Sequence, residues 1–194
     1  MMIERDDIVL IFDCFGLFAG DSMVTYFARH FGPDSAALKD HYCEGADIGE
    51  ISFDELQEKM HRELGIDKDE MSEELKAIAR PDLEMISLVK DLRTRHRVYL
   101  LSNCIRGLLE RYFTGTDFFE CFDKTYRSYE LGLIKPGEEI YRYVRDDIGG
   151  NPSQILFFDD NPRNLPGAEK AGIEAILFTG QEDMLEQLHR RNIF

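Results

Sequence analysis

Residues 8–16 read Ile8-Val9-Leu10-Ile11-Phe12-Asp13-Cys14-Phe15-Gly16. The first five are a continuous apolar run with β-branched members, which is typical of a strand buried on both faces of a sheet. The run then ends in a short polar cluster that begins with Asp13. This stretch predicts a central strand with a carboxylate at its end.

Similar patterns recur along the chain. Three more apolar runs occupy residues 98–101, 155–158 and 175–178, and a more polar run at 123–128 suits the edge of a sheet. Between the runs the apolar residues follow a helical period. Strands that alternate with helices pair in parallel, so we predict an α/β fold with a doubly wound, Rossmann-like parallel sheet.

Local signals mark the helices between these strands. Asp82 is placed to cap a helix over residues 83–92, a second apolar stripe runs over 105–113, and Gly149-Gly150 ends a third helix that follows Pro136. Thr179 and Glu182 have the spacing of a capping box, which predicts the start of the last helix.

Residues 18–80 show no strand pattern. They carry helical stripes that begin at Met23, Phe53 and Leu75, and Ser52 with Glu55 forms a capping box before the second stripe. We expect a small all-α cap over the strand ends, inserted after the first strand, although a plain helical layer on one sheet face is the alternative. The predicted division is an α/β core of residues 1–17 and 81–194 and a helical cap of residues 18–80.

The composition excludes several classes of partner. The chain has 194 residues with 38 acidic and 23 basic side chains, a formal charge of −15. Nucleic acid and anionic membrane both require clustered Lys and Arg, so we expect neither as a partner. A small anionic substrate remains compatible, because one local positive site can override the global charge.

The cysteines and the apolar runs favour a cytoplasmic location. The four cysteines lie far apart without a C-x-x-C pair, which indicates reduced thiols. No apolar stretch approaches the roughly 18 residues of a membrane span. Residues 1–7 place Asp6 and Asp7 directly before the first apolar run, unlike a signal peptide.

Polar residues follow the predicted strands at their ends. Asp13 follows the first strand, Ser102-Asn103 the second and Asp159-Asp160 the fourth, and Lys135 lies in the loop after the polar strand. The carboxyl ends of parallel strands meet at one crevice, so these segments should converge. Three carboxylates, a lysine and a hydroxyl suit Mg²⁺ beside a phosphate. A helix starting after Asn103 would add backbone N–H groups.

The chain resembles the haloacid dehalogenase superfamily in four motifs. Residues 9–16 resemble its nucleophile motif, residues 100–103 its second motif and residues 133–136 its third, while residues 157–172 resemble its metal motif. Within the superfamily, the pattern is most similar to sugar-phosphate phosphatases and to the phosphatase domain joined to epoxide hydrolases.

The resemblance implies a role for each matching position. Asp13 would be the nucleophile that forms a phospho-aspartate, and Lys135 would pair with Asp13 and with the phosphate. Ser102 and the backbone of Asn103 would hold phosphate oxygens.

The metal motif implies further roles. Mg²⁺ would be bound by Asp13, the main-chain carbonyl of Phe15 and Asp160. Asp159 would bind the metal through water or support that shell, and Asn164 would orient the metal-binding loop. The implied substrate is a small phosphorylated metabolite.

Phe15 departs from the phosphatase pattern. The superfamily's phosphatases usually read D-x-D-G-T at the first motif, where the second Asp protonates the leaving alkoxide, and Phe15 cannot donate a proton. General acid–base help contributes about 10²–10⁴ in rate. The departure therefore predicts a slow phosphatase, one restricted to good leaving groups, or a non-catalytic phosphate- or partner-binding protein.

The metal motif weighs against a third alternative. A metal-free 2-haloacid dehalogenase also carries an aromatic residue at position 15, but adjacent carboxylates such as Asp159 and Asp160 would repel a haloacid. A haloacid carboxylate would also require an Arg from the cap, and Arg29 is the one basic residue of the first cap helix, but the sequence assigns it no role. We rank Mg²⁺-dependent phosphomonoester hydrolysis first, the non-catalytic binder second and the dehalogenase third.

Overall fold

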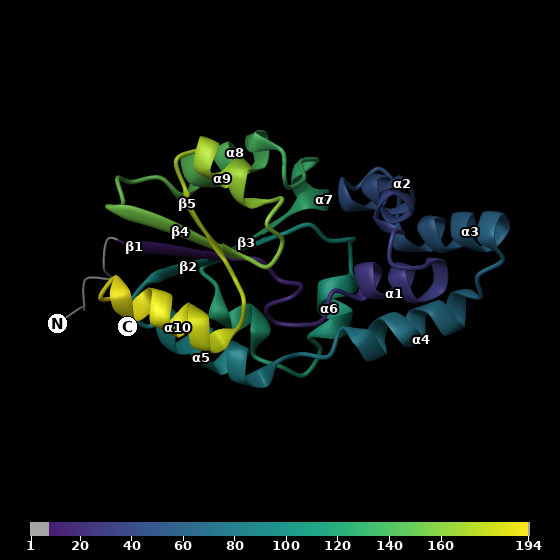
Figure 1. Cartoon of the computed structure of the whole chain (residues 1–194), viewed down its shortest axis with the longest axis horizontal. Coiled ribbons are helices and arrows are strands. Elements are labelled where there is room, and N and C mark those ends of the chain that lie inside the picture. Colours follow the sequence, from purple (N-terminus) through teal and green to yellow (C-terminus); the bar gives the residue numbers. More distant parts are fainter. Residues whose placement is uncertain (1–7, 194) are drawn as a thin grey trace.

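The computed structural model describes residues 8–193, which form a five-stranded parallel sheet with helices around it (Figure 1). The strand order is β3-β2-β1-β4-β5, and every neighbouring pair is parallel. The predicted doubly wound α/β fold is confirmed, with the polar strand at an edge. The strands are β1 (Ile8–Phe12), β2 (Arg97–Ser102), β3 (Lys124–Arg127), β4 (Gln154–Asp159) and β5 (Glu174–Leu177).

The central strand β1 is buried on both faces, as its unbroken apolar run predicts. Val9 and Ile11 pack in one core with α8 and α9, whereas Leu10 and Phe12 pack in the other with α5 and α10. Figure 1 shows these two pairs of helices on opposite sides of the sheet. Their bounds are α5 (Leu83–Arg93), α8 (Glu138–Ile148), α9 (Leu165–Lys170) and α10 (Gln181–Arg190).

Four helices lie between β1 and α5, beyond the end of the sheet at which β1 terminates (Figure 1). We call residues 18–80 the helical insertion. Its two connections to the rest of the chain meet at Ala19, which forms isolated bridges with Phe15 and with Pro81. The helices are α1 (Ser22–Phe31), α2 (Ala36–Asp47), α3 (Phe53–Leu64) and α4 (Lys68–Ile78).

Two of the predicted N-terminal helix caps are confirmed and one is wrong. Ser52 and Glu55 form the predicted capping box, and Asp82 accepts a hydrogen bond from the backbone of Met85. The residue that precedes α10 is Gly180, so Thr179 does not cap that helix. The positive φ of Gly180, 141°, turns the chain one residue later than the capping-box pattern predicts.

The segment after β2 also differs from its prediction. Its helix α6 (Leu108–Tyr112) begins after Gly107, four residues beyond Asn103. A helix start therefore does not face the end of β2. The remaining short elements are the 3₁₀ helix η1 (Phe118–Cys121) and α7 (Ser128–Leu131).

Within residues 8–193, no helix combines the length and apolar composition needed to cross a bilayer. The expectation about residues 1–7 lies outside the described residues.

Candidate functional site

The ends of β1 and β4 bring Asp13 and Asp159 together at the centre of the sheet. The chain passes from β1 to β2 and β3 on one side and to β4 and β5 on the other, so the strand order reverses between β1 and β4. Such a reversal leaves a crevice at the carboxyl ends of the strands. The backbone N–H of Asp13 donates to the carbonyl of Phe158 at 2.9 Å, which continues the ladder up to the crevice.

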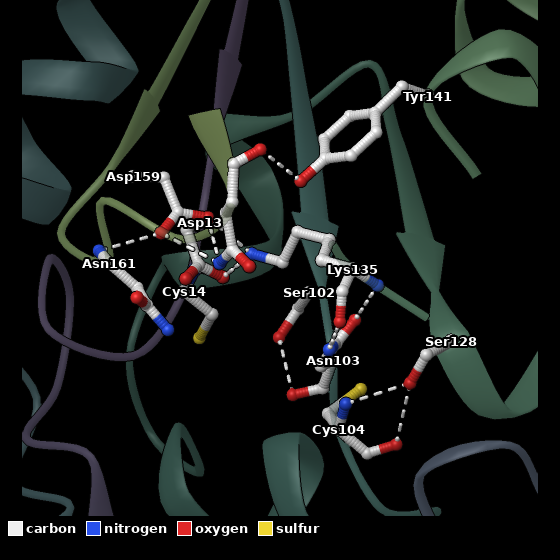
Figure 2. Close-up of polar contacts among 11 residues, drawn as sticks. Asp13, Cys14, Ser102, Asn103, Cys104, Ser128, Lys135, Tyr141, Asp159 and Asn161 are labelled. Carbon is white, nitrogen blue, oxygen red and sulfur yellow. Dashed lines mark hydrogen bonds and ion pairs between the residues drawn. The ribbon is translucent and has the colours of Figure 1, made fainter. Parts of the chain in front are cut away.

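Lys135 connects the two carboxylates. Its Nζ lies 2.7 Å from Asp13 Oδ1 and 2.7 Å from Asp159 Oδ2, and its side chain is 2% exposed (Figure 2). A buried ammonium is costly unless it is paired, and here two carboxylates pair with it. Lys135 thus joins the loop after α7 to the ends of β1 and β4, as the sequence pattern predicts.

Asp159 is fully buried and its oxygens are occupied. Oδ1 accepts from the backbone N–H of Asn161 at 2.9 Å, and Asn164 Nδ2 lies 2.9 Å from both Oδ1 and Oδ2. The carbonyl of Asn164 accepts from the Tyr141 hydroxyl at 2.8 Å. Asp159 therefore organises the loop after β4, whereas its neighbour Asp160 is exposed and lines the adjacent cavity.

Asn103 has a structural contact that its motif did not reveal. Its side chain accepts from the backbone N–H of Lys135 at 2.9 Å and donates to the carbonyl of Lys135 at 2.9 Å. This two-bond clamp ties the end of β2 to the lysine loop (Figure 2). A spacing of 32 residues carries no local signal for such a pair.

The second motif lies at the back of the site. Ser102 is fully buried, and its hydroxyl lies 3.4 Å from the Asn103 carbonyl. The adjacent Cys104 N–H donates to Ser128 Oγ at 3.0 Å. Asn103 and Cys104 line the cavity, whereas the fully buried Ser102 is not among its lining residues. The phosphate-holding role of Ser102 stays a prediction.

Burial dominates the electrostatics of the crevice. It raises the pKa of Asp13 well above its usual value, and Asp159 raises that pKa further, whereas Lys135 opposes both effects. The two carboxylates in turn raise the pKa of Lys135, which keeps the ammonium charged. Burial and Asp159 also raise the pKa of Asp160 to about 6. The cluster holds more negative charge than its single lysine offsets.

The donor set fits a divalent cation. One carboxylate oxygen each from Asp13, Asp159 and Asp160 lies within 4.8 Å of the others. Three carboxylates against one ammonium leave two formal negative charges, and carboxylate oxygens are the donors that Mg²⁺ prefers. The first-motif backbone passes close by, because a Cβ on Gly16 would overlap the Asp160 carboxylate.

We expect Gly16→Ala to weaken Mg²⁺ binding at least about tenfold, because the added methyl group displaces Asp160 (about 1.4 kcal/mol). Gly16 also has a φ of 83°, which alanine adopts only with strain. Gly65→Ala is the matched control, since Gly65 has a φ of 71° and open space around it. Calorimetric titration with Mg²⁺ measures both variants. Wild-type affinity in Gly16→Ala would argue against a metal ion at Asp160.

A cavity of about 290 Å³ opens between the crevice and the helical insertion. Asp13, Phe15, Lys135 and Asp160 line it from the sheet side. The sequence analysis did not single out the residues that line it from the insertion, because helix α2 carries no apolar stripe that marks its inward face. Those residues include Asp21, Ser22, Lys39, Cys43 and Asp47.

Three arginines near the site have different surroundings. Arg29 points to Glu74, with Nη1 3.3 Å from Oε1, and does not line the cavity. Arg106 stacks over the Tyr129 ring at 4.8 Å, and Arg163 lines the cavity. Arg163 is exposed and therefore places a positive charge at the edge of the cavity.

The two thiols beside the motifs are unreactive in character. Cys14 and Cys104 are buried, and desolvation raises the pKa of each well above the usual thiol value. A buried thiol with a raised pKa is a poor nucleophile. Both residues pack as small apolar groups, and the buried Cys104 also borders the cavity.

The comparisons with known proteins agree with this geometry. The model of the haloacid dehalogenase-like hydrolase family matches residues 11–172. A D-ribitol-5-phosphate phosphatase from Bacteroides thetaiotaomicron is 29% identical over 150 residues, covering 72% of each chain. The drimenol cyclase drtB of Aspergillus calidoustus is 34% identical over 98 residues, which are 50% of this chain and 18% of that protein. This chain therefore spans less than a fifth of that relative.

A solved structure shares the fold over almost the whole chain. It is a haloacid dehalogenase family enzyme from Bacteroides thetaiotaomicron, with a TM-score of 0.77 and 22% identity, and the match covers 95% of this chain and 99% of that one. The same enzyme was also solved in complex with magnesium and inorganic phosphate. The family model spans the residues that carry the crevice, and on that evidence this chain belongs to the haloacid dehalogenase-like hydrolases.

Proposed function

We propose that this hydrolase is a Mg²⁺-dependent phosphomonoesterase that acts on a small phosphorylated metabolite through Asp13. The observation that carries the proposal is the crevice between β1 and β4, where Asp13, Lys135 and Asp160 border one cavity. The phosphatase relative and the fold neighbour with magnesium and phosphate support it.

The residues divide the chemistry among them. An Asp13 oxygen attacks phosphorus, so a carboxyl–phosphate bond forms while the bond to the ester oxygen breaks and the alkoxide leaves. Water then hydrolyses the phospho-aspartate and releases inorganic phosphate. Asp13, the Phe15 carbonyl and Asp160 would hold Mg²⁺, which supplies positive charge against the phosphoryl oxygens. Lys135 keeps Asp13 oriented and adds a second positive charge.

The remaining residues support this machinery. Asp159 and Asn164 hold the loop that carries Asp160, and Asn103 holds the loop that carries Lys135. We propose that Ser102 and the Asn103 backbone border the phosphate position, and that the helical insertion is a cap that encloses the leaving group. This cap lies beyond the strand end and contributes a cavity wall, which favours it over a plain layer on one sheet face.

The side chain of Phe15 is the reason to expect slow turnover. Its ring lines the cavity and packs edge-on against Tyr112 with 6.3 Å between ring centroids. It offers no proton where the family's phosphatases place their acid, so the enzyme should favour esters whose leaving group needs no protonation.

Turnover of p-nitrophenyl phosphate tests the proposal, because p-nitrophenolate leaves without a general acid. We expect hydrolysis with Mg²⁺ and its loss in excess chelator. Failure with every divalent metal would overturn the phosphatase and leave the non-catalytic binder that Phe15 also fits. Release of chloride from 2-chloropropionate without metal would instead support the dehalogenase.

A further inference from the structure

The cavity beside Asp13 has a second wall whose charges the phosphoryl chemistry does not use. We call it the insertion wall, and it comes from the start of α1 and from α2. Its charged residues are one lysine and four carboxylates, an excess of three formal negative charges. They are Lys39, Asp21, Asp40, Glu44 and Asp47.

Helix geometry directs these groups at the cavity. Lys39, Cys43 and Asp47 are spaced four residues apart, so they lie on one face of α2. All three line the cavity, and Cys43 is buried between the two charged residues. This part of the wall is therefore one face of α2, and it borders the same cavity as Asp13.

The groups of the wall differ in how well they are paired. Lys39 Nζ lies 3.2 Å from Asp40 Oδ1, and Asp21 caps α1 by accepting from the backbone of Val24 at 2.9 Å. Among residues 8–193, the Asp47 carboxylate has no hydrogen bond or ion pair within bonding distance. Asp47 is partly buried, so it lacks the full hydration that would compensate an unpaired charge.

Burial is the main reason why the ionised form of Asp47 is costly, and the neighbouring carboxylates add to that cost. Desolvation raises the pKa of Asp47 to about 7, with Asp21, Asp40 and Glu44 adding to the rise and Lys39 opposing it. The pKa of Asp21 is raised by burial as well. A positive group in the cavity would lower the pKa of both Asp47 and Asp21 and so favour their ionised forms.

The wall does not have the form of a metal site. Within residues 8–193, the three acidic residues whose oxygens converge within 4.8 Å are Asp13, Asp159 and Asp160, and no wall carboxylate belongs to that group. Spread carboxylates suit an organic cation, whose charge and N–H donors cover a larger volume than a metal ion. The negative charge of the wall would also repel a second anionic group on the substrate.

We propose that the insertion wall binds a protonated amine, so that the substrate is the phosphate monoester of a small amino alcohol. This inference rests on the proposed function, because it names the alcohol part of the ester cleaved at Asp13. Mg²⁺ and Lys135 meet the phosphoryl end, and Asp47 with its neighbours meets the ammonium end. The cavity of about 290 Å³ lies at the small end of ligand pockets, which fits a metabolite of this size.

Three phosphonates of matched length test the charge preference without turnover, because their C–P bond resists hydrolysis. They are 3-aminopropylphosphonate, 3-hydroxypropylphosphonate and 3-phosphonopropionate, which end in a cation, a neutral hydroxyl and an anion. Calorimetric titration with Mg²⁺ present should rank them in that order. We expect at least about tenfold between the amine and the hydroxyl, or about 1.4 kcal/mol.

Asp47→Asn should remove most of this preference while changing the affinity for 3-hydroxypropylphosphonate less than about threefold (about 0.7 kcal/mol). Asp54→Asn is the matched control, because Asp54 is an exposed aspartate of α3 outside the cavity, and it should keep the preference. Binding of the amine to the wild type at pH 7 should also release up to about half a proton more than binding of 3-hydroxypropylphosphonate, since the cation favours ionised Asp47 and the proton release of the phosphonate group is common to both ligands. Titration in buffers of different ionisation enthalpy measures that release.

The outcomes separate the two proposals. Equal or tighter binding of the hydroxyl compound, or an equal loss of all three ligands in Asp47→Asn, overturns the amine subsite. A missing turnover of p-nitrophenyl phosphate overturns the hydrolase proposal and with it the claim that the amino-alcohol ester is a substrate. The amine subsite is still decided by the phosphonate ranking, which does not depend on catalysis.

Discussion

Asp13→Asn is expected to abolish Mg²⁺-dependent hydrolysis of p-nitrophenyl phosphate, lowering kcat by at least about 10³-fold, the scale seen when an enzymatic nucleophile is removed. The amide is a far weaker nucleophile than the carboxylate and cannot form the phospho-aspartate. The fold should persist, because Lys135 keeps its 2.7 Å pair with Asp159 and the amide oxygen can still accept from Cys14 N–H. Steady-state kinetics and a thermal unfolding scan measure the two effects.

Asp160→Asn provides the control for Asp13→Asn. Asp160 is proposed as a metal ligand only, so its loss should weaken Mg²⁺ binding, and higher Mg²⁺ concentrations should restore part of the activity. Asp13→Asn should stay inactive at every Mg²⁺ concentration. If Mg²⁺ rescued both variants equally, Asp13 would be a ligand and the nucleophile would lie elsewhere.

Phe15→Asp is expected to increase the hydrolysis of alkyl phosphates by about 10²-fold, the lower end of the contribution of general acid–base catalysis. Phe15 lines the cavity beside Asp13, so a carboxylic acid there could protonate an alkoxide as it leaves. The gain should be small for p-nitrophenyl phosphate, whose leaving group needs no proton. Ratios of kcat/KM for alkyl and aryl esters measure the change.

Phe15→Asn separates proton donation from a change in space. It removes the ring and its contact with Tyr112 in the same way but cannot act as an acid in the required range. Both variants lose part of a partly buried aromatic contact, which costs about 1–2 kcal/mol of stability. An equal gain in both, or no gain in Phe15→Asp with unchanged Mg²⁺ affinity, would show that the missing acid does not limit the rate.

The strands of the sheet were predictable because their pattern is local. A strand buried on both faces needs consecutive apolar residues, and residues 8–12 and 155–158 satisfy this requirement without regard to their neighbours. Polar residues after those runs must lie at the strand ends, so Asp13 and Asp159 could be placed in one crevice before any coordinates. The Ser52–Glu55 cap was predictable for the same reason, as its partners are three residues apart.

Local patterns predicted two helix starts wrongly. Thr179 and Glu182 have capping-box spacing, yet Gly180 turns the chain and α10 starts one residue later. The stripe from residue 105 similarly predicted a longer helix than α6, since apolar residues at 104 and 105 are buried in the connection itself. A periodic apolar pattern reports burial, and burial does not require a helix.

The sequence by itself determined the parallel sheet, the crevice at its centre and the chemical character of the residues that reach it. Only the tertiary structure decided the contacts of these residues. The oxygens of Asp159 are occupied by hydrogen bonds, whereas Asp160 lines the cavity. Asn103 forms its hydrogen bonds with Lys135, which is 32 residues away in the sequence. The tertiary structure also decided which face of α2 borders the same cavity as Asp13, because a helix face that lines a polar cavity has no apolar stripe to mark it. The burial of a strand can be predicted from residues that are adjacent in the sequence, whereas contacts between distant side chains form only when the chain has folded.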